Sequence, residues 1–360
     1  MFRDVNMEVA GALNDVALVH ASKHGRFAYK RAARAVLTLE EPLEEFVERH
    51  ELREIPYIGP ATERVILEHL ETGKSPTVEK TVQASGKRAE VKAARAYRKN
   101  FLSRSGVLRA LAARAPGAVT LADYRGDLQT HSTWSDGGES IARLAAAARE
   151  RGYAYLGVSD HAYGLRIANG MSMSDARLRA REIDAWNRRA DGAFHVISAV
   201  EANIPADGGV DMTPDELSEF ELVLAAPHSK LRRSEDQTDR MLAAVRQPGV
   251  HVLAHPRGRM YSRRGVLARW DEVFEEARKQ GVAIEIDGDP YRQDLDFTLA
   301  AQALAAGCLF ALDSDAHAGA ELLYAEYAIA HARLARIPAK RIINTWPYEK
   351  LMDWAEERRP

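Results

Sequence analysis

Hydrophobic and polar residues follow a helical pattern over the first 80 residues. Apolar positions recur at helical spacing and predict three helices, at 9–20, 28–39 and 43–49. The stretch LREIPYIGPATERVI then predicts a short helix, a tight turn at Gly59 and a new helix that opens with Pro60 and ends near Gly73. Residues 1–80 therefore predict a small all-α domain in which a tight turn joins two of the helices.

From residue 124 onward the pattern alternates between short apolar runs and amphipathic stretches. The runs predict strands at 124–130, 154–159, 194–200, 221–226, 250–254, 282–286 and 308–313. The stretches predict helices at 139–151, 174–190, 235–247, 268–280, 296–306 and 320–334. Strand–helix alternation favours parallel pairing, and seven such units fit a closed (β/α) barrel better than an open sheet. The predicted fold class is α/β, a TIM-like barrel over residues 121–360.

A basic segment separates the two patterns. Residues 87–114 hold nine basic residues and one acidic residue, Glu90, whereas the whole chain holds 50 basic and 52 acidic residues. We expect residues 81–120 to form a partly helical, basic linker. Two interpretations stay open for it, a solvated face and a surface that contacts nucleic-acid phosphates.

Composition excludes several classes of protein. The single cysteine, Cys308, rules out an intrachain disulfide framework and a thiolate zinc site. No run approaches the roughly 18–20 apolar residues of a membrane span, and the start MFRDVNMEVA lacks the apolar segment of a secretory signal. We therefore expect a cytoplasmic protein that is not bound to membranes. The net charge of −2 names no partner, and protein partners stay unknown.

Imidazole and carboxylate side chains follow the carboxyl ends of the predicted strands, which share one rim in a parallel barrel. The expected metal ligands are His131, Asp136, His161, Glu201, His228, His255, Asp315 and His317. This set is too large for one tetrahedral ion and lacks thiolates, so it predicts two or three divalent ions, Zn²⁺, Mn²⁺ or Fe²⁺, bridged by Glu201. The expected catalytic residues are Glu201, His131, Asp315 and His317. Glu285 and Asp287 end strand six, and the sequence assigns them no role.

Basic residues on the same rim are candidates for binding a phosphate. Arg257 and Arg259 directly follow His255, and Lys230 lies in the loop after His228. Guanidinium and ammonium groups pair with phosphate oxygens. Solvated loop residues are the alternative interpretation.

The metal-binding motifs resemble those of the polymerase-and-histidinol-phosphatase (PHP) family, over about residues 124–355. They occur in the family's order: D-L-Q-T-H with S-D-G at 127–137, D-H at 160–161, E at 201, H-S at 228–229, H-P at 255–256 and D-A-H at 315–317. The resemblance implies a distorted seven-stranded (β/α) barrel with a trinuclear metal centre. It also implies a metal-dependent phosphoesterase.

A narrower resemblance joins the chain to bacterial family X DNA polymerases. The stretches HPRGR, AIEIDG and RIINTWPYEKLMDWAEERR resemble their C-terminal PHP domain. Residues 1–80 resemble their first helical domain, including its helix-hairpin-helix. The chain has no room for a polymerase palm between them. This likeness implies 3′–5′ exonuclease activity on single-stranded DNA or DNA 3′ ends, with DNA as the partner.

Two residues depart from these family patterns. Gln129 stands where the family has a histidine, and its neutral oxygen is a weaker ligand, so one ion position is expected to be weak or empty. In the hairpin loop 57–61 only Gly59 remains of the usual glycines, and Pro60 offers no N–H to a phosphate. Two alternatives to an exonuclease therefore stay open: a small-molecule phosphatase acting on a phosphomonoester, and a catalytically weakened DNA-binding module.

Overall fold

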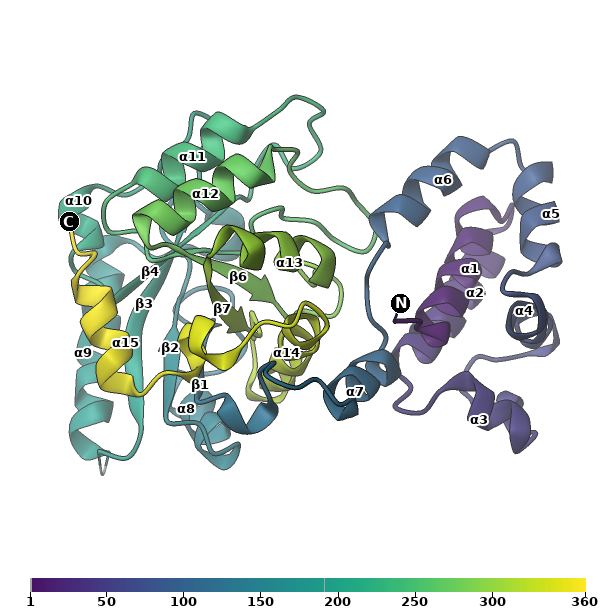
Figure 1. The fold of residues 1–360 in the computed structure, drawn as a ribbon, viewed down its shortest axis with the longest axis horizontal. Coiled ribbons are helices and arrows are strands. Elements are labelled where there is room, and N and C mark those ends of the chain that lie inside the picture. The colour runs from purple at the N-terminus through teal and green to yellow at the C-terminus, as the bar shows by residue number, and fades with distance from the viewer. Residues whose placement is uncertain (1, 191) are drawn as a thin grey trace. The chain divides into compact units, whose positions relative to one another are not determined.

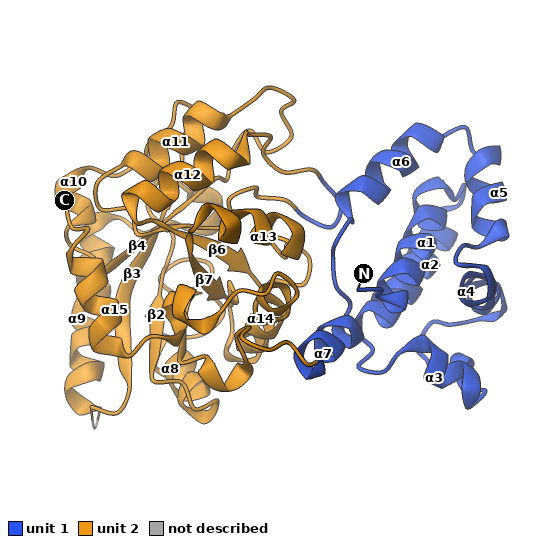
Figure 2. Cartoon of the chain, viewed as in Figure 1, with its two compact units in different colours: residues 1–113, 260–263 blue, residues 114–259, 264–360 orange. Residues whose placement is uncertain are grey.

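The chain divides into two compact units. The computed structural model describes residues 2–190 and 192–360. Residues 1–113 with 260–263 form the first unit, and residues 114–259 with 264–360 form the second (Figure 2). The segment expected to be a linker, 81–120, therefore belongs to the helical unit as far as residue 113. The linker interpretation is corrected on this point.

The first unit is built from helices around one apolar core. Its α-helices are α1 (Val5–Val19), α2 (Lys23–Thr38), α3 (Leu43–Glu48), α4 (Pro60–Thr72), α5 (Pro76–Ala84), α6 (Arg88–Tyr97) and α7 (Arg104–Ala112), shown in Figure 1. Leu13 of α1, Val36 of α2 and Ile66 of α4 are fully buried in the same cluster. Helices α1 to α6 form because each buries one apolar face in that cluster.

The predicted hairpin is present in this unit. A 3-10 turn at Leu52–Glu54 precedes α4, whose first residue is Pro60. The Thr62 hydroxyl accepts a hydrogen bond from the Gly59 N–H at 2.9 Å, which caps the helix start. Gly73 ends α4 with φ 75°, a left-handed conformation that glycine adopts at little cost. The start and the stop signals in the sequence are both confirmed.

The second unit is a parallel barrel. Among the described residues, seven strands form one sheet in chain order: β1 (Gly126–Thr130), β2 (Tyr155–Val158), β3 (His195–Asn203), β4 (Leu222–Ala226), β5 (Val252–Leu253), β6 (Ala283–Asp287) and β7 (Leu309–Asp313). The helices between and after them are α8 (Ile141–Glu150), α9 (Met173–Arg189), α10 (Pro214–Leu217), α11 (Thr238–Arg246), α12 (Trp270–Gln280), α13 (Phe297–Ala306), α14 (Ala325–Leu334) and α15 (Tyr348–Glu356). The predicted fold class is confirmed.

Carboxylates help to close the barrel between β1 and β7. A parallel bridge joins Thr130 to Ala316. Asp313 accepts a hydrogen bond from the Leu128 N–H at 2.8 Å, and Asp127 accepts one from the Ser314 N–H at 3.2 Å. The two carboxylates accept hydrogen bonds that backbone carbonyls would accept in a regular pair of strands, because a buried backbone N–H needs an acceptor. The first aspartate of the D-L-Q-T-H motif is therefore part of this closure.

Side chains that point into the barrel change from apolar to ionisable along the strands. On β3, Ile197 and Ala199 lie in the apolar core, and Glu201 follows at the next position of the same face. On β6, Ala283 is followed in the same way by Glu285 and Asp287. The amino-terminal half of the barrel is thus a packed core, and its carboxyl-terminal mouth carries the chemistry.

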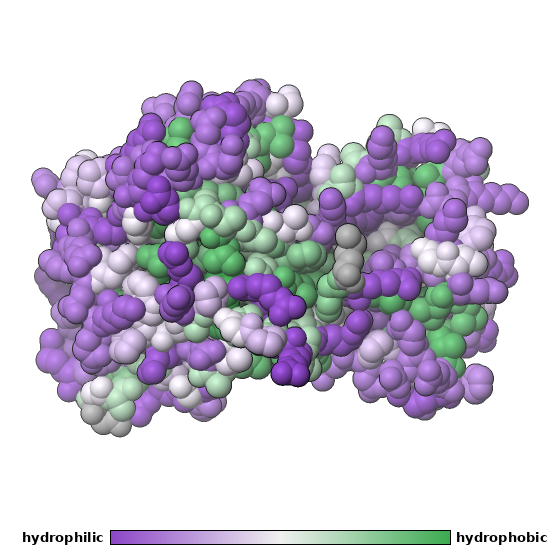
Figure 3. Space-filling view, in the orientation of Figure 1, coloured by the Kyte–Doolittle hydropathy of each residue, from purple (hydrophilic) through white to green (hydrophobic). Residues whose placement is uncertain are grey.

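The exterior of the molecule is largely polar. Hydrophilic residues cover most of the face drawn in Figure 3, with hydrophobic residues in smaller areas between them. Within residues 2–190 and 192–360, no helix has the length and apolar character needed to cross a bilayer.

Candidate metal centre

The eight side chains expected to bind metal come from loops and strand ends on one rim. His131 directly follows β1, His161 comes after β2, and Glu201 lies near the end of β3. His228 and His255 follow β4 and β5, while Asp315 and His317 follow β7. Asp136 lies in the loop after β1. The structure brings all eight into neighbouring groups of potential ligands.

Glu201 lies at the centre of this arrangement. Its Oε2 is 3.3 Å from His131 Nε2 and 3.3 Å from His161 Nδ1. Its Oε1 is 3.0 Å from His228 Nε2 and 3.3 Å from His255 Nε2. Each oxygen of one buried carboxylate therefore faces two imidazoles, which is the arrangement of a carboxylate that bridges two cations.

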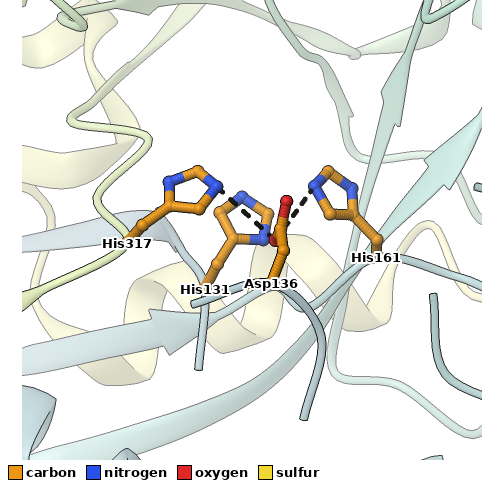
Figure 4. Close-up of side chains that lie close together, drawn as sticks. All are labelled: His131, Asp136, His161 and His317. Carbon is orange, nitrogen blue, oxygen red and sulfur yellow. Dashed lines mark ion pairs between the residues drawn. The ribbon is translucent and has the colours of Figure 1, made fainter. Parts of the chain in front are cut away.

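Asp136 forms a second group of donors with histidines from three loops. Its Oδ1 is 3.6 Å from His161 Nε2 and 3.5 Å from His317 Nε2, and Figure 4 shows the two rings on either side of the carboxylate. The His131 ring lies between them, stacked on His161 at 4.4 Å and on His317 at 4.6 Å between centroids. Asp136 and His317 are partly exposed, so this group lies at the open side of the cluster.

Asp315 completes a third group. Its Oδ1 is 3.0 Å from His131 Nε2, and its backbone has a left-handed φ of 55°. Gln129 lies beside this group and donates from Nε2 to Glu201 Oε2 at 3.0 Å. The departure from the family pattern is thus an amide placed directly against the central carboxylate.

Unpaired polar atoms in this cluster fit divalent cations. Glu201 Oε1, Gln129 Oε1 and His255 Nε2 are buried and form no hydrogen bond within the described parts of the chain. Buried donors and acceptors are almost always paired in proteins. Acceptor atoms left unpaired and gathered in one place suit ions with nitrogen and oxygen ligands such as Zn²⁺, Mn²⁺ or Fe²⁺.

Neighbouring groups fix which nitrogen of each histidine faces the cluster. The Asn203 amide donates to Asp211 at 2.8 Å, so its Oδ1 accepts from His228 Nδ1 at 2.7 Å. His317 Nδ1 donates to the Asp315 carbonyl at 2.8 Å. Because Nδ1 carries the proton in both rings, Nε2 is left free to bind a cation.

Glu285 and Asp287, which had no assigned role, lie behind His255. The Nδ1 atom of His255 is 3.4 Å from Glu285 Oε2 and 3.8 Å from Asp287 Oδ2, and the His255 backbone N–H donates to Glu285 at 2.5 Å. A neutral imidazole has one lone pair, so a proton on Nδ1 facing these carboxylates leaves Nε2 for the cluster. We assign these carboxylates to orienting His255.

The electrostatic environment favours the protonation states that bind cations. Burial alone would raise the pKa of Glu201, but the imidazoles of His161, His228 and His255 lower this pKa well below its usual value. Burial lowers the pKa of His161 and the pKa of His255 to about 4. At neutral pH Glu201 is therefore ionised beside neutral His161 and His255. Hydrogen bonds to neighbouring carboxylates instead raise the pKa of His131 and the pKa of His317, so a cation would have to displace a proton there.

The arginines expected to bind substrate are engaged in the fold. Arg259 is only 3% exposed, pairs with Asp296 at 3.2 Å and donates to the carbonyls of Arg292 and Gln293. Arg257 is partly exposed and also pairs with Asp296 at 3.2 Å. Lys230 is exposed and lies 3.5 Å from the Ala206 carbonyl. The assignment of Arg259 to substrate binding is corrected, because a buried guanidinium that is held by Asp296 and two backbone carbonyls is not accessible to a ligand.

Sequence analysis missed one basic residue of the cluster, Arg292. Its Nη2 is 3.2 Å from Asp315 Oδ2, and its Nε is 3.1 Å from Asp287 Oδ2. The available signal was its place in the loop after β6, on the same rim as the ligands. Four residues separate Arg292 from Asp287, and four separate it from Phe297 at the start of α13. No motif marks this position, so the signal was weak.

Comparisons with known proteins agree with both units. Residues 4–75 match the family described as a helix-hairpin-helix domain. The chain is 34% identical over 228 residues to the DNA polymerase/3′-5′ exonuclease PolX of Bacillus subtilis, a match that covers 63% of this chain and 40% of that protein. It is 27% identical over 248 residues to the probable phosphatase YcdX of Escherichia coli, which covers 65% of this chain and 95% of the relative.

One solved structure is also similar. A histidinol phosphate phosphatase from Lactococcus lactis, in complex with zinc, L-histidinol and phosphate, superposes with a TM-score of 0.41 at 13% sequence identity. The superposition covers 58% of this chain and 94% of that one.

Proposed function

Because the chain belongs to the PHP family and joins a helix-hairpin-helix unit to a PHP barrel without a polymerase core between them, we propose that it is a metal-dependent phosphoesterase that processes DNA 3′ ends. The proposed reaction is 3′–5′ exonucleolytic cleavage. The observation that carries the proposal is the placement of four imidazoles against the two oxygens of Glu201.

The residues of the cluster have separate tasks in this reaction. Divalent ions bound there would supply an activated water and neutralise charge on the phosphoryl group. Glu201 would join two ion positions. One would be served by His131 with Asp315. The other would be served by His228 with His255, because both Nε2 atoms lie against Glu201 Oε1. Asp136, His161 and His317 would hold a further ion at the open side. Asn203, Glu285 and Asp287 keep the imidazoles oriented.

A basic face of α2 supports nucleic acid as the substrate. Four exposed cations lie three or four residues apart and so share one side of the helix. They are Lys23, Arg26, Lys30 and Arg34. Within the described chain, none of them forms an ion pair with a carboxylate, so their charge is available to a phosphate backbone.

Two exposed aromatic rings accompany these cations. Phe27 is 50% exposed and lies 5.9 Å from Lys23 Nζ, and Tyr57 at the hairpin tip is 62% exposed with the Arg31 guanidinium 5.6 Å away. Cationic side chains interleaved with exposed rings are typical of surfaces that bind single strands, since bases stack on the rings. We name Lys23, Arg26, Phe27, Lys30, Arg31, Arg34 and Tyr57 the α2 face.

The basic segment 87–114 contributes less than its composition indicates. Arg98 is buried and pairs with Asp15, and Arg95 pairs with Asp15 at 2.5 Å and with Glu79 at 2.5 Å. Arg104 lies 3.5 Å from Glu40. Several of its charges therefore stabilise the helical unit, and we place the DNA contact on the α2 face instead.

A small-molecule phosphatase is the second candidate. The match to the probable phosphatase YcdX extends over 248 residues and covers 95% of that relative. YcdX is therefore about as long as the barrel of this chain alone. The same metal cluster would serve a phosphomonoester. The two candidates differ in whether turnover depends on the α2 face.

The test is hydrolysis by the full-length protein loaded with Mn²⁺ or Zn²⁺. Single-stranded DNA labelled at its 5′ end should yield a ladder of shortened products, while DNA labelled at its 3′ end should release the label as a mononucleotide. Glu201→Gln should abolish both reactions, with Glu139→Gln on the same rim as the matched control. Turnover of phosphomonoesters with no ladder on DNA would favour the small-molecule phosphatase.

A further inference from the structure

The loop after β6 carries Arg292 to the metal cluster. The guanidinium lies between two carboxylates, with Nε 3.1 Å from Asp287 Oδ2 and Nη2 3.2 Å from Asp315 Oδ2. Its side chain keeps 22% of its surface exposed. The group therefore lies between two carboxylates of the rim that carries the expected metal ligands, while part of its side chain stays exposed.

Backbone bonds make this loop rigid at its base. The Asp287 N–H donates to the Asp294 carbonyl at 2.6 Å, and the Asp294 N–H donates back to the Asp287 carbonyl at 3.1 Å. Asp289 accepts a hydrogen bond from the Tyr291 N–H at 2.7 Å, which tightens the turn just before Arg292. A short loop closed on itself in this way loses little entropy when a ligand binds.

Buried side chains fix the other flank of the loop. Gln293 is fully buried, donates to the Pro290 carbonyl at 3.0 Å and accepts from His331 Nε2 at 2.8 Å. The Asp296 carboxylate forms ion pairs with both Arg257 and Arg259. The arginines that the sequence offered for substrate thus support the loop that presents Arg292.

The two oxygens of Asp315 have different neighbours. Oδ1 faces His131 Nε2 at 3.0 Å, on the side of the proposed ion, whereas Oδ2 faces Arg292. Arg292 therefore does not occupy the coordinating side of this carboxylate. Nε and Nη2 lie at ion-pair distance from these carboxylates, and Nη1 forms no hydrogen bond within the described parts of the chain, so it can serve a ligand at the cluster.

We propose that Arg292 is a substrate-binding residue that donates from Nη1 to a non-bridging oxygen of the phosphoryl group undergoing hydrolysis. This inference rests on the proposed phosphoesterase function. Guanidinium groups suit this task, because they are permanently charged and their donors lie in a plane that matches phosphate oxygens. Arg292 would then bind the charged phosphoryl group that is hydrolysed. The α2 face would bind the rest of the nucleic-acid strand.

The test compares Arg292→Gln with wild type in the ion-loaded, full-length protein. Inorganic phosphate is the probe, and its affinity is measured by calorimetry while bound metal is measured by elemental analysis. We expect unchanged metal content and phosphate affinity weakened about 10- to 100-fold, the range for losing one hydrogen bond to a charged group. In hydrolysis, KM should rise by more than kcat falls.

Two further variants separate substrate binding from a structural role. Arg292→Lys keeps the charge but cannot span Asp287 and Asp315, so its phosphate affinity should lie between those of wild type and Arg292→Gln. Arg177→Gln removes an exposed guanidinium that pairs with Glu219 on the outside of the barrel, and it should leave phosphate affinity unchanged. Unaltered phosphate affinity in Arg292→Gln would overturn the inference, as would loss of metal together with phosphate binding.

The same measurements distinguish this inference from the proposed function. A wild-type protein that hydrolyses no phosphoester, yet binds ions and phosphate, would refute the function. The difference in phosphate affinity between wild type and Arg292→Gln would still decide the role of the arginine.

Discussion

At the scale of single residues, the position of a donor in the sequence predicted its place in the cluster but not its neighbours. His131, His161, His228, His255 and His317 lie at one rim because each directly follows a parallel strand. Arg257 and Arg259 occupy the same rim, and yet Asp296 engages both. The sequence pattern of the rim does not show that these arginines pair with Asp296, a buried carboxylate nearly 40 residues later in the chain.

Gln129 gives a prediction at this scale. Its amide donates to Glu201 and its Oε1 is buried without a partner, so it offers at best a neutral oxygen to an ion. In Gln129→His, an imidazole should strengthen the ion position shared by His131, Glu201 and Asp315. Elemental analysis after dialysis should then show more metal per chain than in wild type, by up to about one ion.

The control for this prediction is Gln83→His on the exposed surface of α5, which should leave the metal content at the wild-type level. Equal metal content in Gln129→His and wild type would show that the amide does not limit ion binding.

At the scale of elements, the sequence predicted those whose hydrophobic period is clear. The strand and helix runs between residues 124 and 334 correspond to β1–β7 and to α8, α9 and α11–α14. The four-residue α10 and the C-terminal α15 were not predicted, since the first is a single turn and the second follows irregular 3-10 turns. In the basic segment, the pairing of Arg95 and Arg98 with Asp15 could not be foreseen, because Asp15 lies about 80 residues earlier in the chain.

The α2 face gives the prediction for an element. Arg31→Glu combined with Arg34→Glu reverses two exposed charges that form no ion pair with a carboxylate among the described residues. We expect weaker binding of single-stranded DNA and a flatter dependence of affinity on salt, with the slope of log affinity against log salt reduced by at least about 1.4 units. Fluorescence anisotropy across a salt series measures both.

A matched reversal on the barrel, Arg278→Glu with Lys279→Glu on α12, controls for net charge and should leave the salt slope unchanged. If the α2 variant lost turnover of a phosphomonoester together with DNA binding, the substitutions would have impaired folding and not a contact with DNA.

At the scale of the whole molecule, buried histidines outside the cluster connect stability to pH. His251 accepts from the Val223 N–H at 3.0 Å and donates to the Ala355 carbonyl of α15 at 2.9 Å. Burial lowers the pKa of His251 to about 4, whereas an unfolded histidine titrates near 6.5. Below that pH the unfolded chain takes up a proton that the folded chain does not, so acid favours unfolding.

We therefore expect the free energy of unfolding of the metal-free protein to fall between about pH 6.5 and pH 4. His251 alone should account for about 2 kcal/mol between pH 7 and pH 5. His251→Gln keeps a donor for Ala355 but does not titrate, so its urea unfolding curves should show a smaller loss over this interval. The exposed His24→Gln controls for removal of an imidazole, and equal pH dependence in His251→Gln and wild type would contradict the assignment.

Sharing Glu201 among four imidazoles has a consequence for how ions enter the barrel. A first ion bound beside Glu201 would lower the cost of binding the second, because both would share this one carboxylate. Occupancy should then rise steeply over a narrow range of free cation concentration, so that a partly supplied population contains mostly empty and fully loaded molecules. Activity would then change sharply over a narrow range of free cation concentration.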